Sequence, residues 1–178
     1  MQNSDTSSSD WQIRHAVLRD VNAIFGLIRA HQDDLILRPI GDIIANIDRF
    51  FVAEKNGRIV GCASWKILPE IGSPESASVE VQSVAVEFAY RRSGIGKGLV
   101  ERILEEIRQF DFPHAIVLTF APNFFRSLGF HEISKTKVMH KLYTGCIGCT
   151  KYADPFSCPE IAMQYDLRVT RGGNCKTA

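Results

Sequence analysis

The chain has 178 residues, of which 45% are hydrophobic and 10% aromatic, enough for one sizeable core and too few for two ordinary domains. Its 21 basic and 20 acidic residues are interspersed and leave a net charge of +1, so we expect no nucleic-acid partner. The N-terminus lacks the pattern of a signal peptide and no segment approaches the roughly 18 apolar residues of a membrane helix, so we expect a cytoplasmic protein without membrane contact.

The first half of the chain predicts a strand, two helices and a hairpin. Residues 1–10 are rich in Ser and Asp and are expected to be disordered. A short strand over 13–17 precedes a helix for which Asp20 is the candidate N-cap, and a second helix is expected after Pro39. Residues 50–65 predict a hairpin, because two β-prone runs flank Asn56-Gly57, a dipeptide favoured in type I′ turns.

The second half alternates strands and helices. The valine-rich run 77–86 predicts a central strand, and a helix follows from Gly96 with its apolar residues at helical spacing. Residues 115–120 predict a buried strand, and 122–129 a short helix that ends at a glycine. This order predicts a mixed α/β fold with a glycine-rich corner at the carboxyl end of a central strand.

The glycine-rich corner is suited to a phosphate or pyrophosphate. A strand that enters a glycine turn opening a helix presents backbone N–H groups and the positive helix end to an anion. A Walker A loop would need glycine at Arg91 and Ser or Thr at Gly98, and the dinucleotide fingerprint would need glycine at Leu99. The pattern present is Arg-x-x-Gly-x-Gly after "SVAV"; the alternative interpretation is a tight turn with surface arginines.

This pattern resembles the pyrophosphate loop of the GNAT superfamily of acetyl-CoA-dependent N-acetyltransferases. The resemblance implies the GNAT acyltransferase fold, a mixed, mostly antiparallel, twisted α/β sheet flanked by helices, over a domain of residues 11–145. It also implies acetyl-CoA as co-substrate, an oxyanion held by a backbone N–H of residues 84–86, and a set of cofactor-binding residues: Val84, Val86, Arg91, Arg92, Ser93, Gly94, Ile95, Gly96 and Lys97.

Further segments narrow the resemblance. "LRP", "DRFFVAE", "GCASW", "VLTF", "FF..LGF" and "CPEIAM", spread over Ile13 to Met163, look like those of the short N-acetylglutamate synthase-like acetyltransferases. The resemblance implies direct acetyl transfer to the α-amino group of L-glutamate, the first step of arginine biosynthesis. The alternatives are an acetyltransferase for another amino acid or a protein N-terminus, and a non-catalytic acyl-CoA or metal sensor. Small molecules are the expected partners, and a homodimer is left open.

Two positions bear on proton transfer. An amine must be neutral to attack a thioester, so a base is useful, and Glu80 in the valine-rich strand is the candidate. The alternative for Glu80 is a solvated or salt-bridged side chain. Many superfamily members carry a tyrosine acid in "FY..LGF", where this chain has Phe125, so the thiolate is expected to leave unassisted. Tyr143 could serve instead, but is more simply a partly buried core residue.

Arg38 and Cys62 are the candidates for acceptor binding. A substrate with two carboxylates calls for bidentate donors, and the resemblance places an arginine at the joint that Arg38 occupies. The alternative for Arg38 is a solvated loop side chain. Cys62 aligns with a cysteine near the acceptor pocket of some synthases, and its alternative is a small buried hydrophobe.

The region 146–178 is expected to be a Cys-rich extension whose last ten or so residues are disordered. Cys146-x-x-Cys149 and Cys158, together with His140 or Cys175, could hold a structural zinc ion. Reduced packing cysteines or a redox pair are the alternative interpretations.

Overall fold

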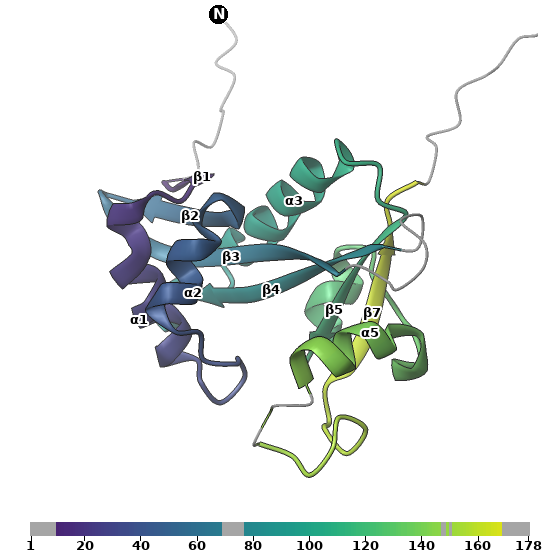
Figure 1. Cartoon of the computed structure of the whole chain (residues 1–178). Coiled ribbons are helices and arrows are strands. Elements are labelled where there is room, and N and C mark those ends of the chain that lie inside the picture. Colours follow the sequence, from purple (N-terminus) through teal and green to yellow (C-terminus); the bar gives the residue numbers. More distant parts are fainter. Residues whose placement is uncertain (1–9, 69–76, 147–148, 150, 169–178) are drawn as a thin grey trace, which may run out of the picture. The chain divides into compact units, whose positions relative to one another are not determined.

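The computed structural model describes residues 10–68, 77–146, 149 and 151–168 (Figure 1). Seven strands form one sheet in the order β1-β2-β3-β4-β5-β7-β6. Their bounds are Gln12–His15 (β1), Phe50–Lys55 (β2), Arg58–Leu68 (β3), Ser78–Val86 (β4), His114–Thr119 (β5), His131–Glu132 (β6) and Ile161–Asp166 (β7). The helices are Val21–Ala30 (α1), Ile40–Ala45 (α2), Ile95–Arg108 (α3), Pro122–Ser127 (α4) and Met139–Lys141 (α5).

The sheet is mixed and mostly antiparallel, as expected. β1 with β2, β2 with β3, β5 with β7 and β6 with β7 are antiparallel, whereas β4 and β5 are parallel. The hairpin prediction is confirmed, because Asn56 and Gly57 connect β2 to β3 with φ of 50° and 75°, the positive values that a type I′ turn requires. No helix in the described part of the chain is long and apolar enough to cross a membrane.

The chain divides into two compact units, 1–64 with 82–103 and 65–81 with 104–178. In the first unit, α1 and α2 cover one face of the strands. Apolar side chains of both helices form a buried cluster with strand residues of the same face: Phe50, Val52, Cys62 and Ala85. Side chains alternate along a strand, so Phe51 and Gly61 face the other way, where Phe51 lies under Arg102 of α3 and Gly61 packs against the same helix.

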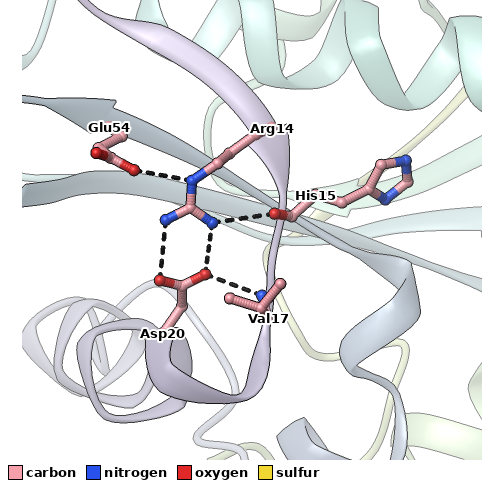
Figure 2. A network of polar contacts seen from close by, with 5 residues as sticks. All are labelled: Arg14, His15, Val17, Asp20 and Glu54. Atoms are coloured by element: carbon pink, nitrogen blue, oxygen red, sulfur yellow. Dashed lines mark hydrogen bonds and ion pairs between the residues drawn. The ribbon is translucent and has the colours of Figure 1, made fainter. Parts of the chain in front are cut away.

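An ion-pair network links β1 to the start of α1 (Figure 2). The Arg14 guanidinium donates to both carboxylate oxygens of Asp20, at 2.6 and 3.0 Å, and to Glu54 at 2.8 Å. The Asp20 carboxylate also accepts from the backbone N–H of Val17. Asp20 lies at the N-cap position of α1, as expected, but its side chain makes no cap hydrogen bond to the helix, because the carboxylate is bound by groups that precede it.

The network predicts a pH-dependent contribution to stability. The hydrogen bonds from Arg14 hold the pKa of Asp20 below its usual range, against the opposing effect of burial. A carboxylate whose pKa is lower in the folded state stabilises the protein at every pH above its unfolded-state pKa of about 3.9. This stabilisation is lost as the pH falls from that pKa toward the lower folded-state pKa. We expect Asp20→Asn to lower the free energy of unfolding by about 1–2 kcal/mol at pH 7.

Urea unfolding of both proteins at pH 7 and pH 3 measures this difference. The gap between wild type and Asp20→Asn should narrow at the lower pH, since the Asp20 carboxylate takes up a proton in the unfolded state before it does so in the folded state, which favours unfolding of the wild type. Asp48→Asn, which removes an exposed carboxylate from the same unit, is the matched control and should change little. An equal gap at both pH values would contradict the electrostatic explanation.

The second unit contains β5, β6, β7 and the helices α4 and α5. Its buried cluster consists of Leu68, Ile116, Val138 and Ala162. β7 was not anticipated as a strand, and it lies in the region expected to be a Cys-rich extension, where it pairs with β5 over its full length from His114↔Asp166 to Thr119↔Ile161. The sheet thus continues past residue 145. The terminal region 169–178, expected to be disordered, lies outside the described residues.

Candidate active site

The glycine loop follows β4 in the first unit and leads into α3. Gly94 adopts φ of 86° and Arg92 φ of 63°, both in the left-handed region. The first helical hydrogen bond runs from Gly98 N to Gly94 O at 2.9 Å. The N–H groups of residues 95–97 thus precede any helical acceptor. Together with the positive helix end, they form the kind of cradle that binds phosphate oxygens.

Glycines at positions 61 and 98 allow β3 and the segment around β1 to pack closely against the start of α3. A Cβ added to Gly98 would lie 2.8 Å from Ile13 Cδ1 and 3.0 Å from Trp11 Cη2, so a larger residue there would have to displace these two side chains. On β3, a Cβ at Gly61 would lie 2.9 Å from Ile95 Cγ2. The glycines at 61 and 98 therefore serve packing, whereas Gly94 serves backbone conformation.

The basic side chains of the loop point to solvent. Arg91, Arg92 and Lys97 are exposed, and Lys97 lies 3.8 Å from Glu101 in an exposed pair one helical turn on. Val84 and Val86 of β4, expected to line the cofactor, are half-buried. The strand is irregular just before them, because Ser83 has φ of 56°, a value that non-glycine residues seldom adopt.

Arg38 is held at the start of α2 by three side chains of the same unit. Its Nε donates to Asp42 Oδ2 at 2.5 Å, and its Nη1 donates to Ser64 Oγ at 3.3 Å and to the side-chain oxygen of Gln82. The Arg38 side chain is 13% exposed. Among the described residues, Nη2 has no hydrogen-bond partner. Arg38 is thus not a solvated loop arginine; it is a fixed cation with two N–H groups left over.

Cys62 is fully buried in the α1–α2 cluster and donates through Sγ to Ser83 O at 3.6 Å. Burial raises the pKa of its thiol to about 12. At neutral pH Cys62 is a thiol and not a nucleophilic thiolate. A mechanism with an acetylated Cys62 intermediate is therefore disfavoured. A direct transfer from acetyl-CoA to the acceptor does not need an ionised Cys62.

In the second unit, Glu80 forms a buried ion pair with Lys141, a partner that the sequence analysis did not identify. The Nζ of Lys141 lies 2.6 Å from Glu80 Oε1, and the two side chains are 11% and 6% exposed. The salt-bridged alternative for Glu80 is thus realised. The spacing of the neighbouring residues indicates this burial. Lys141 lies three residues after Val138 and next to Leu142, both of which are buried, so a helical backbone places Lys141 on the same inward face.

The position that carries a tyrosine acid in many relatives is an aromatic core position here. Phe125 is 4% exposed and meets Phe124 and Phe130 edge to face, at centroid distances of 4.9 and 5.3 Å. It has no group that could donate a proton. Tyr143 is 63% exposed, so the expectation of a partly buried core tyrosine is wrong.

The described cysteines of the second unit do not assemble into a metal site. Within the described residues, no three His, Cys, Asp or Glu side chains converge as metal ligands. His140 Nε2 is hydrogen-bonded to Ser78 Oγ at 2.8 Å, and Cys158 donates to Glu160 at 3.6 Å. Burial raises the pKa of the Cys146 and Cys158 thiols. Cys149 is half-buried, and Cys175 lies outside the described range.

The fold and the loop define a class of acyltransferase, and comparison with known proteins agrees. Residues 14–133 match the model of the acetyltransferase (GNAT) family, and the chain belongs to that family. Two relatives are each 31% identical: an uncharacterised N-acetyltransferase of Chlorobaculum tepidum over 88% of this chain and 96% of its own, and an amino-acid acetyltransferase of Mycobacterium tuberculosis over 74% of each chain.

Solved structures give the same fold. Rv2747 of Mycobacterium tuberculosis, crystallised in complex with CoA and NLQ, aligns with a TM-score of 0.72 and 27% identity over 87% of this chain and 98% of its own. N-acetylglutamate synthase of Neisseria gonorrhoeae, complexed with coenzyme A and N-acetyl-glutamate, aligns with a TM-score of 0.71 at 22% identity, over 88% of this chain and 35% of its own. The protein is an acetyl-CoA-dependent acetyltransferase of the GNAT type with an α/β fold.

Proposed function

We propose that this acetyltransferase acetylates the α-amino group of a free amino acid, with L-glutamate as the preferred acceptor. The observation that carries the acceptor class is Arg38, a largely buried guanidinium whose Nη2 is left without a partner among the described residues. A carboxylate supplies the planar pair of oxygens that such a group binds. Relatives named amino-acid acetyltransferase, at about 31% identity, support the same class.

The acetyl-CoA contacts are proposed for the glycine loop and the end of β4. The backbone N–H groups at the start of α3 and the exposed basic side chains would neutralise the pyrophosphate. The proposed cofactor-binding residues are Val84, Val86, Arg91, Arg92, Ser93, Gly94, Ile95, Gly96 and Lys97. A backbone N–H of residues 84–86 is proposed to hold the oxyanion, a role that needs no particular side chain.

The proposed chemistry is a single direct transfer. The acceptor ammonium loses a proton to Glu80, directly or through water, and the neutral amine attacks the thioester carbon. The C–S bond then breaks, the CoA thiolate leaves, and the second proton on the attacking nitrogen passes to water or to the departing thiolate. Phe125 cannot protonate the leaving group, and a thiol with a pKa of about 8.5 leaves tolerably well without help. Cys62 takes no covalent part in this scheme, because its buried thiol is not ionised at neutral pH.

Arg38→Lys is the variant that tests the acceptor anchor. Lysine keeps the positive charge but cannot donate two parallel hydrogen bonds to a carboxylate as a guanidinium does. We therefore expect KM for glutamate to rise roughly thirtyfold, with KM for acetyl-CoA unchanged. Steady-state kinetics with each substrate varied in turn gives both constants. Arg49→Lys, in the same unit and half-buried, is the matched control. Equal increases in both KM values would indicate a general structural defect and contradict the assignment.

The acceptor itself is identified by mass spectrometry. Purified protein is incubated with acetyl-CoA and, separately, with each common amino acid, and the acetylated product is detected by its mass. Selective acetylation of glutamate is the expected result. Acetylation of another amino acid in place of glutamate would support a free amino acid as the acceptor class and overturn glutamate as the preferred acceptor. Acetyl-CoA binding without any acetylated amino acid would overturn the proposal and favour a protein N-terminus as acceptor or a sensor role.

A further inference from the structure

Three side chains from two separate segments of the first unit form a stack beside the glycine loop. The rings of His31 and Phe88 are nearly parallel, with centroids 4.9 Å apart and an interplanar angle of 8°. The guanidinium carbon of Arg91 lies over the Phe88 ring, 4.1 Å from its centroid. His31 directly follows α1, whereas Phe88 and Arg91 bound the turn that leads into the loop. The stack therefore ties the end of α1 to the loop.

The His31 end of the stack is fixed in place. The residue is 7% exposed, and its Nδ1 is 2.8 Å from Leu27 O, one helical turn back. A carbonyl can only accept, so Nδ1 carries the hydrogen. Nε2 is buried and has no hydrogen-bond partner within the described residues. The Nδ1 hydrogen bond and the buried surroundings thus hold the ring, and its face is stacked on Phe88.

Phe88 is held by its backbone and yet is 63% exposed. Its turn is closed by Arg91 N to Phe88 O at 3.3 Å and Tyr90 N to Glu87 O at 2.9 Å, and Glu87 N donates to Val60 O of β3 at 2.9 Å. The core gains little from so exposed a ring. Its ring stacks on His31 and lies under the Arg91 guanidinium.

We propose that His31 and Phe88 are positioning residues that pre-orient the Arg91 guanidinium for the pyrophosphate of acetyl-CoA. The inference rests on the proposed cofactor-binding role of Arg91. An exposed arginine loses much rotamer freedom when it binds a ligand, and a cation–π contact that restricts it beforehand lowers that loss. His31 and Phe88 thus act on cofactor affinity through Arg91, and the role requires no contact of their own with acetyl-CoA.

Phe88→Leu tests the stack, because leucine keeps an apolar side chain and removes the aromatic face. We expect its affinity for CoA, measured by titration calorimetry, to fall about two- to fivefold, the range of an exposed cation–π contact. Phe88→Tyr retains the face and should bind CoA as the wild type does. Because Phe88 is exposed, the melting temperature of all these variants should stay close to that of the wild type.

A double-mutant cycle with Arg91→Ala separates positioning from a merely structural role. In the Arg91→Ala background, Phe88→Leu should cause no further loss of CoA affinity. The same loss in both backgrounds, or no loss in either, would overturn the inference. Calorimetry with CoA needs no acceptor, so the result is independent of the amino-acid proposal. Wild-type CoA affinity in Arg91→Ala alone would overturn the role of Arg91 and the inference with it.

Discussion

Lys141→Met is expected to lower the free energy of unfolding by about 3 kcal/mol, because it leaves the Glu80 carboxylate buried without its cation. The two side chains are 11% and 6% exposed, and the Nζ–Oε1 distance is 2.6 Å. Breaking such a pair is costly because the remaining charge loses its partner and is still kept from water. Equilibrium urea unfolding, with the m-value checked for constancy, measures the change.

The double variant Glu80→Gln with Lys141→Met is the control for this prediction. It removes both charges and keeps similar volumes, so most of the lost stability should return. Lys135→Met, a half-buried lysine of the same unit that has no carboxylate within ion-pair distance in the described structure, is the matched single variant. A double variant no more stable than Lys141→Met would contradict the ion-pair explanation and leave side-chain packing as the cause.

Glu80→Gln is expected to lower kcat/KM about a hundredfold at neutral pH, the contribution typical of a general base. The glutamine side chain cannot accept the proton that the acceptor ammonium must lose. As the pH rises, more of the acceptor is deprotonated in solution, so the deficit should shrink. The pH dependence of kcat/KM for wild type and variant, with acceptor and acetyl-CoA varied separately, measures it.

Two comparisons keep this activity prediction separate from stability. Lys141→Met retains the carboxylate and loses stability, so at a temperature where it is folded it should keep far more activity than Glu80→Gln. The Glu80→Gln and Lys141→Met double variant should be stable and equally slow. A deficit in Glu80→Gln that does not change with pH would contradict the base assignment and leave Glu80 with the structural role that its ion pair already indicates.

Elements with local causes were predictable. Asn56-Gly57 specifies its turn because those two residues tolerate the positive φ values found there, and the hairpin follows from the apolar runs on either side. The amphipathic spacing after Gly96 likewise gives α3. β7 was not predicted, because no turn or cap motif next to it in the sequence indicates a strand. The strand is defined by its pairing with β5, whose residues are far from it in the sequence.

The candidate site also has a part that the sequence could predict and a part that it could not. The glycine loop could be found from sequence, since its chemistry lies in consecutive backbone N–H groups and in glycines at fixed spacing. The bonding of Arg38 could not, because its partners Ser64 and Gln82 lie 26 and 44 residues away. The predicted zinc ligands show the same limit. Cys-x-x-Cys spacing permits chelation, but whether further ligands converge depends on how distant segments fold, and among the described residues no three possible ligands come together.

The sequence by itself determined the family, the glycine loop proposed to bind the cofactor, and the order of most strands and helices, because each is encoded by residues close together in the chain. Only the tertiary structure decided which charges pair and which stay available. It joined Lys141 to Glu80, left Nη2 of Arg38 unpaired among the described residues, and stacked His31 on Phe88. Such contacts depend on strand register and helix packing between distant segments, which no local pattern of residues specifies.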